Sequence, residues 1–264
     1  MLAKEEEEPE NWHIVHFEAI KEPDQPEYPA SCILELDGRS EGEALAPLRY
    51  SLDKLKKIKR RIGSYFFGAL YQQRPSPREG GMFKREWFEI LPTLPPGMET
   101  FVRYWDKAGT EGGGALTAGL LMARKDSVYY IVDVITGQWT AGKREQVISR
   151  TLFADREKHG YMQTWIEQEP GSGGKESAEN TVRRNPAYTV RADRPSGDKT
   201  LRAEPLAAQA EINNVKLIRG AWNDTFLDIL TAFPTGKYKD QVDAASGAFN
   251  KLAMSIEAEA VAYA

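Results

Sequence analysis

The chain has 264 residues, of which 41% are hydrophobic and 28% charged, an ordinary balance for one large globular domain or for a domain with an appendage. The lone cysteine, Cys32, excludes an internal disulfide and favours a reducing compartment. No apolar run reaches membrane-spanning length and the first residues are acidic rather than signal-like, so we expect a soluble intracellular protein without membrane contact.

The net charge of −4 argues by itself against a nucleic-acid partner, yet the position of charges matters more than their sum. Two basic clusters stand out. The first alone is better explained as the solvated face of a helix, whereas the second follows a candidate metal-binding loop and is the stronger candidate for phosphate contacts. The first contains Lys54, Lys56, Lys57, Lys59, Arg60 and Arg61, and the second contains Arg183, Arg184, Arg191, Arg194, Lys199 and Arg202.

The N-terminal part of the chain carries few periodic elements. Residues 1–10 are acidic and patternless and are predicted to be disordered. A strand is expected at 11–20, and a helix begins at the N-cap Ser51 and continues through Ile62. Proline and glycine then interrupt every pattern, which is typical of a semi-rigid connector. We therefore divide the chain into residues 1–75, too poor in elements for a core of their own, a linker at 76–98, and a main domain at 99–264.

The main domain opens with three apolar runs joined by short turns, one of them rich in glycine at 109–114, which predicts an antiparallel meander. Helical and strand-like spacings then alternate, so we expect an α/β domain with a mixed central sheet flanked by helices. The expected strands are 101–105, 116–122, 128–134, 164–166, 188–190 and 215–218, and the expected helices are 140–158, 175–184, 201–212, 225–232 and 239–254.

Four carboxylates fall where this order of elements would bring them together. Asp106 ends the first strand of the meander and Glu167 ends the fourth strand, and sites in open α/β sheets form at strand ends. Asp240 and Asp243 lie three apart in the final helix and so share a face. Because clustered acids repel one another unless cations neutralise them, we predict two divalent ions, Mg²⁺ or Mn²⁺. Such a pair can activate water and stabilise the leaving oxygen of a phosphodiester.

Asp106, Glu167 and Asp240 each have a competing interpretation, whereas Asp243 is harder to dismiss because it stands beside Val242 and Ala244 on the half-buried side of its helix. Asp106 could cap a turn, and Asp240 could be an ordinary acidic residue at a helix N-terminus. Glu169 competes with Glu167, because both fall on one side of an alternating strand. We expect Glu167 to bind the metal and Glu169 to support that ligand from behind.

The glycine-rich sequence at 171–175, Gly-Ser-Gly-Gly-Lys, is similar to a phosphate-binding loop but lacks the required spacing. It is either a plain turn or a flexible loop beside Glu167 that touches DNA phosphates. No Walker motif occurs in the sequence, so we expect no ATP hydrolysis.

Six short motifs occur in a fixed order: Leu-Tyr-Gln-Gln-Arg-Pro (70–75), Gly-Met-Phe-Lys-Arg-Glu-Trp-Phe (81–88), Tyr-Trp-Asp-Lys-Ala (104–108), Ile-Glu-Gln-Glu-Pro-Gly-Ser-Gly-Gly-Lys (166–175), Gly-Asp-Lys (197–199) with Arg202 and Ala203, and Lys-Asp-Gln-Val-Asp-Ala (239–244). Over residues 45–254 this set resembles the large terminase subunit of tailed bacteriophages. The resemblance implies a ribonuclease H-like nuclease that cuts concatemeric double-stranded DNA before and after packaging, in the host cell cytoplasm.

The resemblance places Asp106 and Glu167 at the family's first two metal-binding acids and puts Asp240 and Asp243 in its closing acidic motif. Family members often carry two adjacent acids before the Gln-Val-Asp, whereas the first of these positions is Lys239 here. The principal ligand of the closing motif therefore stays open between Asp240 and Asp243. The ATPase motor that normally precedes this domain is missing, and residues 1–75 look like its last part, so we expect the chain to be a fragment.

The partners that the resemblance implies are double-stranded DNA, the portal protein, the small terminase subunit and the ATPase motor domain. Two alternatives stay open. One is another ribonuclease H-like DNA enzyme, such as a transposase or junction resolvase, and the other is a non-catalytic module that docks on the portal and grips DNA. The candidates for holding the DNA backbone are Lys175, Arg183, Arg184, Lys199 and Arg202.

Overall fold

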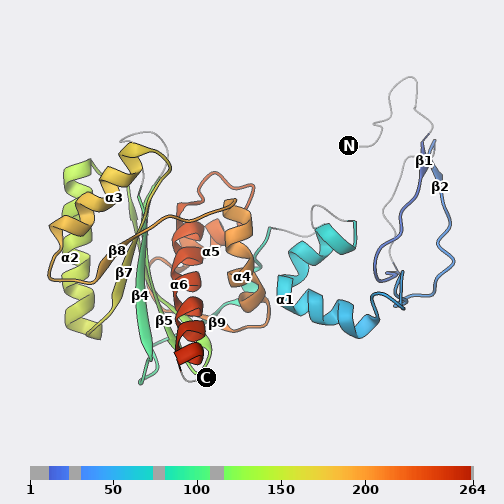
Figure 1. Cartoon of the computed structure of the whole chain (residues 1–264), viewed down its shortest axis with the longest axis horizontal. Helices are drawn as coiled ribbons and strands as arrows, with labels where there is room; N and C mark the ends of the chain where they lie inside the picture. Colours follow the sequence, from blue (N-terminus) through green and yellow to red (C-terminus); the bar gives the residue numbers. More distant parts are fainter. Residues whose placement is uncertain (1–11, 24–30, 74–80, 108–115, 263–264) are drawn as a thin grey trace. The chain divides into compact units, whose positions relative to one another are not determined.

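The computed structural model describes residues 12–23, 31–73, 81–107 and 116–262, and the chain divides into two compact units, Met1–Glu79 and Gly80–Ala264 (Figure 1). Two sequence expectations, disorder of residues 1–10 and a glycine-rich turn at 109–114, lie outside the described residues. None of the described helices combines the length and apolarity needed to cross a membrane.

The first unit is built around helix α1 (Leu52–Tyr71), which begins as the sequence predicts: the Ser51 hydroxyl accepts a hydrogen bond from the Lys54 amide. Gly63 interrupts the helix with a φ of 74°, a conformation that glycine adopts without steric cost. The strand expected at 11–20 is much shorter: β1 (His13–Ile14) makes only a two-residue parallel pair with β2 (Ile33–Leu34). A small apolar cluster forms on α1 all the same, with Ala44, Leu55 and Phe67 at its centre.

The second unit contains a seven-stranded mixed sheet in the order β3-β9-β6-β5-β4-β7-β8. The meander β4-β5-β6 is antiparallel, and the outer strands join it in parallel, which confirms the α/β architecture expected from the sequence. The strands are β3 (Glu89–Leu91), β4 (Thr100–Asp106), β5 (Thr117–Lys125), β6 (Val128–Gly137), β7 (Gln163–Glu167), β8 (Val190–Asp193) and β9 (Val215–Ile218).

Helices cover both faces of this sheet. Figure 1 shows the helices in two layers, one on each face, with the strands between them. The first layer holds α2 (Ala141–His159) and α3 (Ser172–Arg184), and the second holds α4 (Lys199–Glu211), α5 (Asn223–Ala232) and α6 (Asp240–Ala262).

Much of the segment assigned to a linker belongs instead to the second unit. A short 3-10 helix, η1 (Arg85–Trp87), leads into β3, and β3 pairs in parallel with β9 at the edge of the sheet. Met82 and Phe83 are buried, and the Met82 amide donates a hydrogen bond to the carbonyl of Phe233 at 2.8 Å. The prolines that suggested a connector lie on either side of these apolar residues, whose burial ties the segment down.

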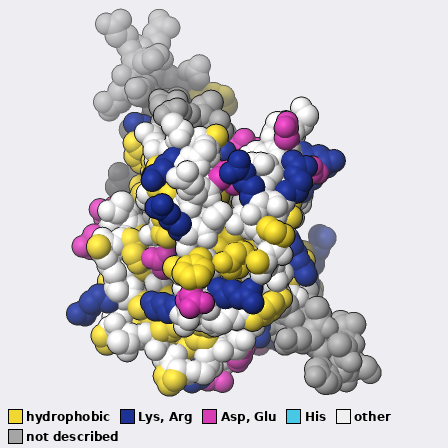
Figure 2. Space-filling model, turned by 90° about the vertical axis from the view of Figure 1, so that its left-hand side faces the viewer, with side chains coloured by type: hydrophobic (Ala, Val, Ile, Leu, Met, Phe, Trp, Pro, Cys, Tyr) yellow, Lys and Arg dark blue, Asp and Glu magenta, His cyan; other side chains and the backbone are white. Residues whose placement is uncertain are grey.

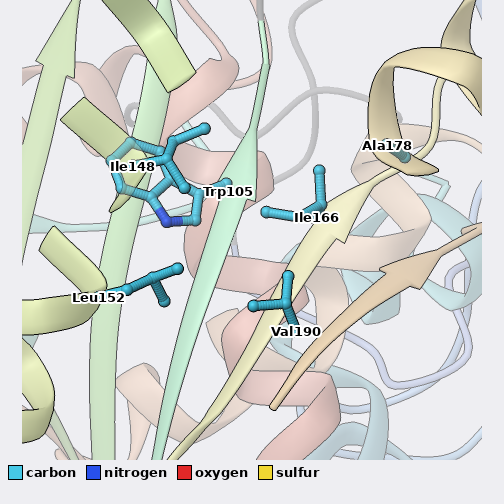
Figure 3. Close-up of a cluster of buried hydrophobic side chains, with 6 residues drawn as sticks. All are labelled: Trp105, Ile148, Leu152, Ile166, Ala178 and Val190. Atoms are coloured by element: carbon cyan, nitrogen blue, oxygen red, sulfur yellow. The ribbon is translucent and has the colours of Figure 1, made fainter. Parts of the chain in front are cut away.

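The alternation of side chains along β4 decides which groups meet on each face of the sheet. Trp105 points toward α2 and α3, where it joins a buried cluster (Figure 3). Asp106 therefore points toward the opposite layer, where α6 lies. The other members of the cluster are Ile148, Leu152, Ile166, Ala178 and Val190.

His159 at the end of α2 predicts a measurable sensitivity to acid. Its ring packs on Phe101 with a centroid distance of 4.6 Å, and burial, followed by the charge of Lys158, lowers the pKa of His159 below its ordinary 6.5. The unfolded chain then takes up a proton at higher pH than the folded chain, so stability falls as pH drops through 6.5. In His159→Gln the decrease in melting temperature between neutral and acidic buffer should be smaller than in the wild type. An equal decrease in both proteins would contradict this assignment.

Candidate active site

Asp106 lies at the C-terminal end of β4 and is only 6% exposed. Two residues earlier on the same face, the ring of Tyr104 contacts α6 at Gly247, where an added Cβ would lie 2.4 Å from the ring. Such a close approach requires glycine and brings the first turn of α6 close to the end of β4. The predicted convergence of the final helix with Asp106 is therefore sterically built into the fold.

Glu167 reaches the same place from the neighbouring strand. Strand β7 is parallel to β4, and Trp105 pairs with Ile166, so Asp106 and Glu167 occupy successive positions at adjacent strand ends. The side chain of Glu167 is 10% exposed. Burying two carboxylates side by side is costly unless each has a compensating positive charge.

Asp243 and Asp240 come from the first turn of α6 but differ in their surroundings. The Asp243 side chain is 1% exposed and is surrounded by polar groups of the cluster. Asp240 instead accepts a hydrogen bond from the amide of Leu116 at 3.0 Å, which ties α6 to the segment entering β5. Of the two acids that the sequence left open, Asp243 is the more deeply buried among the other carboxylates.

Two basic residues of α4 lie among these carboxylates, where the sequence had suggested contacts to DNA. Lys199 pairs with Asp243 and lies 3.8 Å from Asp106 Oδ2. The guanidinium of Arg202 bridges Glu167 Oε1 and Asp243 Oδ1, at 3.1 Å each. The cluster thus carries its own counter-charges.

The electrostatics of the cluster follow from its burial. Burial, and then the charge of Glu167, raise the pKa of Asp106 well above its ordinary range, with Lys199 opposing the change. Burial also raises the pKa of Asp243 to about 6, although the hydrogen bond from Lys199 acts in the other direction. The negative charge of both carboxylates is therefore incompletely compensated inside the cluster, a deficit that a bound cation would relieve.

The carboxylate oxygens of the cluster are suitable ligands for a hard divalent cation, although they do not form a complete coordination site in this structure. Asp106 Oδ2 and Glu167 Oε2 are buried oxygens without a hydrogen-bond partner, and carboxylate oxygens are the ligands that Mg²⁺ and Mn²⁺ prefer. Within the described ranges, no three acidic, His or Cys side chains already form a metal-binding group. Lys199 and Arg202 place their cationic groups among the carboxylates instead.

The remaining predicted residues lie outside the buried cluster. Strand β7 ends at Glu167, so alternation no longer governs Glu169, which is exposed. Lys175 and Arg183 of α3 are mostly exposed and form weak i,i+4 pairs with Glu179 at 3.8 and 3.9 Å. Arg184 is exposed at the end of the same helix. Their role in DNA binding stays a prediction.

A buried polar network beside Asp106 was missed by the sequence analysis. Lys107 is 5% exposed, and its ammonium donates hydrogen bonds to Glu145 Oε1 of α2 and to Ser177 O and Thr181 Oγ1 of α3, at 3.3, 2.8 and 2.9 Å. The Thr181 hydroxyl in turn donates to Glu145 at 2.7 Å. The network fixes the end of β4 against both helices, and its only sequence signal was a lysine directly after an apolar strand.

The sequence did not predict Asp193 either. This acid ends β8 and lies directly opposite Glu167 in the pairing of β7 with β8. It accepts hydrogen bonds from the hydroxyl of Tyr104 and from Lys251 of α6. Both of its oxygens therefore have partners, and its role is to hold α6 on the sheet. The rule that sites form at strand ends would have found it had the expected strand been extended from residue 190 to residue 193.

The contact between Gly247 and Tyr104 yields a prediction about this geometry. In Gly247→Ala the added methyl must displace either the buried Tyr104 ring or α6, at a cost of about 1–3 kcal/mol in the free energy of unfolding. Displacement of α6 also shifts Asp243, and small misplacements of that kind can reduce turnover by up to about a hundredfold. A thermal melt and a cleavage assay measure the two effects.

The control is Gly142→Ala in α2, where an added Cβ meets nothing within 4 Å. That helix should gain up to about 1 kcal/mol from the change. Equal behaviour of the two variants would show that the close approach at Gly247 does not constrain α6.

The mixed sheet, its two helical layers and the acids at the ends of β4 and β7 define a ribonuclease H-like domain. The family model described as the terminase RNaseH-like domain matches residues 103–252, more than half of the chain. The chain therefore belongs to this family. No curated protein sequence matches it.

Solved structures share the fold at low sequence identity. The large terminase of the thermophilic bacteriophage D6E in complex with ADP is 14% identical, with a TM-score of 0.52, over 82% of this chain and 54% of that one. The large terminase nuclease of thermophilic phage G20c with bound magnesium is 13% identical, with a TM-score of 0.50, over 66% and 98%. The human cytomegalovirus terminase nuclease domain, Mn soaked and inhibitor bound, is 13% identical, with a TM-score of 0.50, over 64% and 94%. The chain thus spans about half the length of the D6E large terminase.

Proposed function

We propose that this chain is a divalent-metal-dependent endodeoxyribonuclease of a phage DNA-packaging terminase, which cuts double-stranded concatemeric DNA. One observation carries the proposal: Asp106, Glu167 and Asp243, from three separate elements, meet in one buried cluster in which two carboxylate oxygens have no hydrogen-bond partner. Family membership supports it, as do the bound magnesium of the G20c nuclease and the Mn soak of the cytomegalovirus nuclease domain.

Asp106, Glu167 and Asp243 would hold the cations, with Asp240 contributing mainly through its position at the start of α6. Two such ions, Mg²⁺ or Mn²⁺, would supply an activated water and stabilise the leaving oxygen of the phosphodiester. Arg202 keeps Glu167 and Asp243 at a fixed separation through its two hydrogen bonds.

Lys199 has a second role in this proposal. Its side chain is 44% exposed, and it lies between the carboxylates because they attract it. Cations bound by the acids would weaken that attraction and would leave the ammonium of Lys199 free to contact a phosphate of the DNA backbone. The exposed residues Lys175, Arg183 and Arg184 would extend this contact along the duplex.

The wider setting is also part of the proposal. The partners would be the portal protein, the small terminase subunit and an ATPase motor domain, in the host cell cytoplasm. This chain itself would not hydrolyse ATP. Support comes from the family and from the ADP-bound D6E large terminase. This chain matches about half of that protein.

Incubation of supercoiled plasmid with the chain and Mn²⁺ or Mg²⁺ tests the proposal. We expect nicked and linear products that disappear when a chelator is added. A panel of linear and branched DNA separates packaging-type cleavage from junction resolution, for which branched substrates would be strongly preferred.

A second candidate function, a non-catalytic module that grips DNA, is favoured by one observation: Lys199 and Arg202 already pair with Glu167 and Asp243 without a metal. Binding of duplex DNA without any metal-dependent cleavage would support that alternative over the nuclease.

A further inference from the structure

An open hollow of about 860 Å³ lies on the face of the sheet opposite to the carboxylate cluster. Its floor contains Arg103 and Asp133, from β4 and β6. One wall is the side of α2 that carries Arg150 and Lys158, and the other is formed by the segments that follow β3 and β9. We call this hollow the α2 groove. It belongs to the second unit alone and takes no part in the proposed cleavage.

The rim of the α2 groove carries unbalanced positive charge. Arg150 and Lys158 are exposed and lie eight residues apart on α2, which places them on one side of the helix. Arg219 stands exposed on the opposite wall. Across the part of the chain that the structure describes, none of the three side chains has an ion-pair partner. The two acids that line the groove, Asp133 of β6 and Asp155 of α2, are in contrast already paired with Arg103.

The walls below this rim are apolar. Leu94 and Ile218 line the groove and pack on a buried cluster beneath it, and Trp222 adds an aromatic ring. On the side that Figure 2 faces, where α2 forms the outer layer, hydrophobic patches are bordered by Lys and Arg side chains together with some acidic ones. A concave apolar surface with a polar rim is the arrangement in which protein segments bury an anchor residue.

We infer that the α2 groove docks an acidic segment of a partner protein, with an aromatic or aliphatic anchor against Leu94, Ile218 and Trp222. The rim cations then meet the acidic side chains of the segment, and complementary charge speeds and orients such an encounter. Duplex DNA fits less well. Its phosphates would meet only the rim cations and would leave the apolar walls, Leu94, Ile218 and Trp222, uncovered.

The test uses the full chain in the presence of a chelator, so that its outcome is independent of cleavage. The probe is a short fluorescein-labelled peptide of Glu and Phe, followed by anisotropy, with a Glu and Ala peptide of equal charge as comparison. We expect the first peptide to bind and the second to bind at least about tenfold more weakly, because it lacks an anchor. Failure of the Glu and Phe peptide to bind, or equal binding of both, would overturn the inference.

Variants locate the binding site. Arg150→Glu with Lys158→Glu should weaken peptide binding by on the order of tenfold, since each reversal replaces an attraction by a repulsion. The matched control, Lys56→Glu with Lys57→Glu on the exposed face of α1, changes the net charge equally and should leave binding unchanged. An equal loss of peptide affinity in both variants would show that total charge alone sets binding, and would contradict binding in the α2 groove.

A duplex oligonucleotide in the same assay distinguishes the two classes of partner. We expect the groove variant to bind DNA as the wild type does. If DNA binding fell as much as peptide binding, the groove would be a nucleic-acid contact and the inference would be wrong.

Discussion

Replacement of Asp106 by Asn is expected to abolish metal-dependent DNA cleavage while the protein stays folded. The substitution keeps the size of the side chain but removes the charge of a carboxylate whose Oδ2 has no hydrogen-bond partner in the cluster. Changes to groups that merely orient metal ligands cost about 10–100-fold, so loss of a ligand should exceed about a hundredfold. Initial rates of plasmid cleavage in Mn²⁺ measure the effect.

The fold itself should tolerate this change. In the metal-free variant the neutral amide would no longer repel Glu167, the strongest of the acidic neighbours that raise the pKa of Asp106, so the melting temperature should not fall. The control is Asp126→Asn, at the exposed turn between β5 and β6, which should cleave at the wild-type rate. A fully active Asp106→Asn protein would remove this residue from the mechanism.

Removal of Arg103 is expected to destabilise the protein more than any surface change. Its side chain is fully buried and donates two hydrogen bonds to Asp155, at 2.8 Å each, and one to Asp133 at 2.9 Å. Arg103→Met leaves Asp155 buried without its counter-charge, which costs about 3–5 kcal/mol. Chemical denaturation of the two proteins gives the difference in the free energy of unfolding.

Two further variants separate burial from charge. Arg85 pairs with Asp224 and Asp228 at the surface, so Arg85→Met should cost less than about 1 kcal/mol. Combining Arg103→Met with Asp155→Leu should recover part of the lost stability, since no carboxylate is then stranded beside residue 103 in the core. A double variant as unstable as Arg103→Met would indicate that packing, rather than the orphaned charge, sets the cost.

The elements of the main domain could be predicted because each has a clear period. The meander and the helices α2 to α6 occur at the expected places, and β9 has the expected bounds. Strand β3 could not be foreseen: its three residues lie among prolines, and its pairing with β9 joins segments more than a hundred residues apart. Local patterns carry no information about such a pairing, which depends on burial of distant neighbours such as Phe83 and Phe233.

For the site, the acids were accessible from the sequence and their partners were not. The position of Asp106 and Glu167 at strand ends follows from alternation and parallel pairing. The pairing of Lys199 and Arg202 with those acids depends on where α4 packs against α6, which no local pattern determines. The same holds for Lys107, whose partners lie on two helices that follow it in the chain.

The most direct test of the central claim is to locate bound manganese in crystals soaked with Mn²⁺, using its anomalous scattering. We expect anomalous peaks next to Asp106 and to Glu167 or Asp243, and a Lys199 side chain that has moved away from the carboxylates. Ion pairs of Lys199 and Arg202 that persist at saturating Mn²⁺, with no manganese between Asp106 and Glu167, would contradict it.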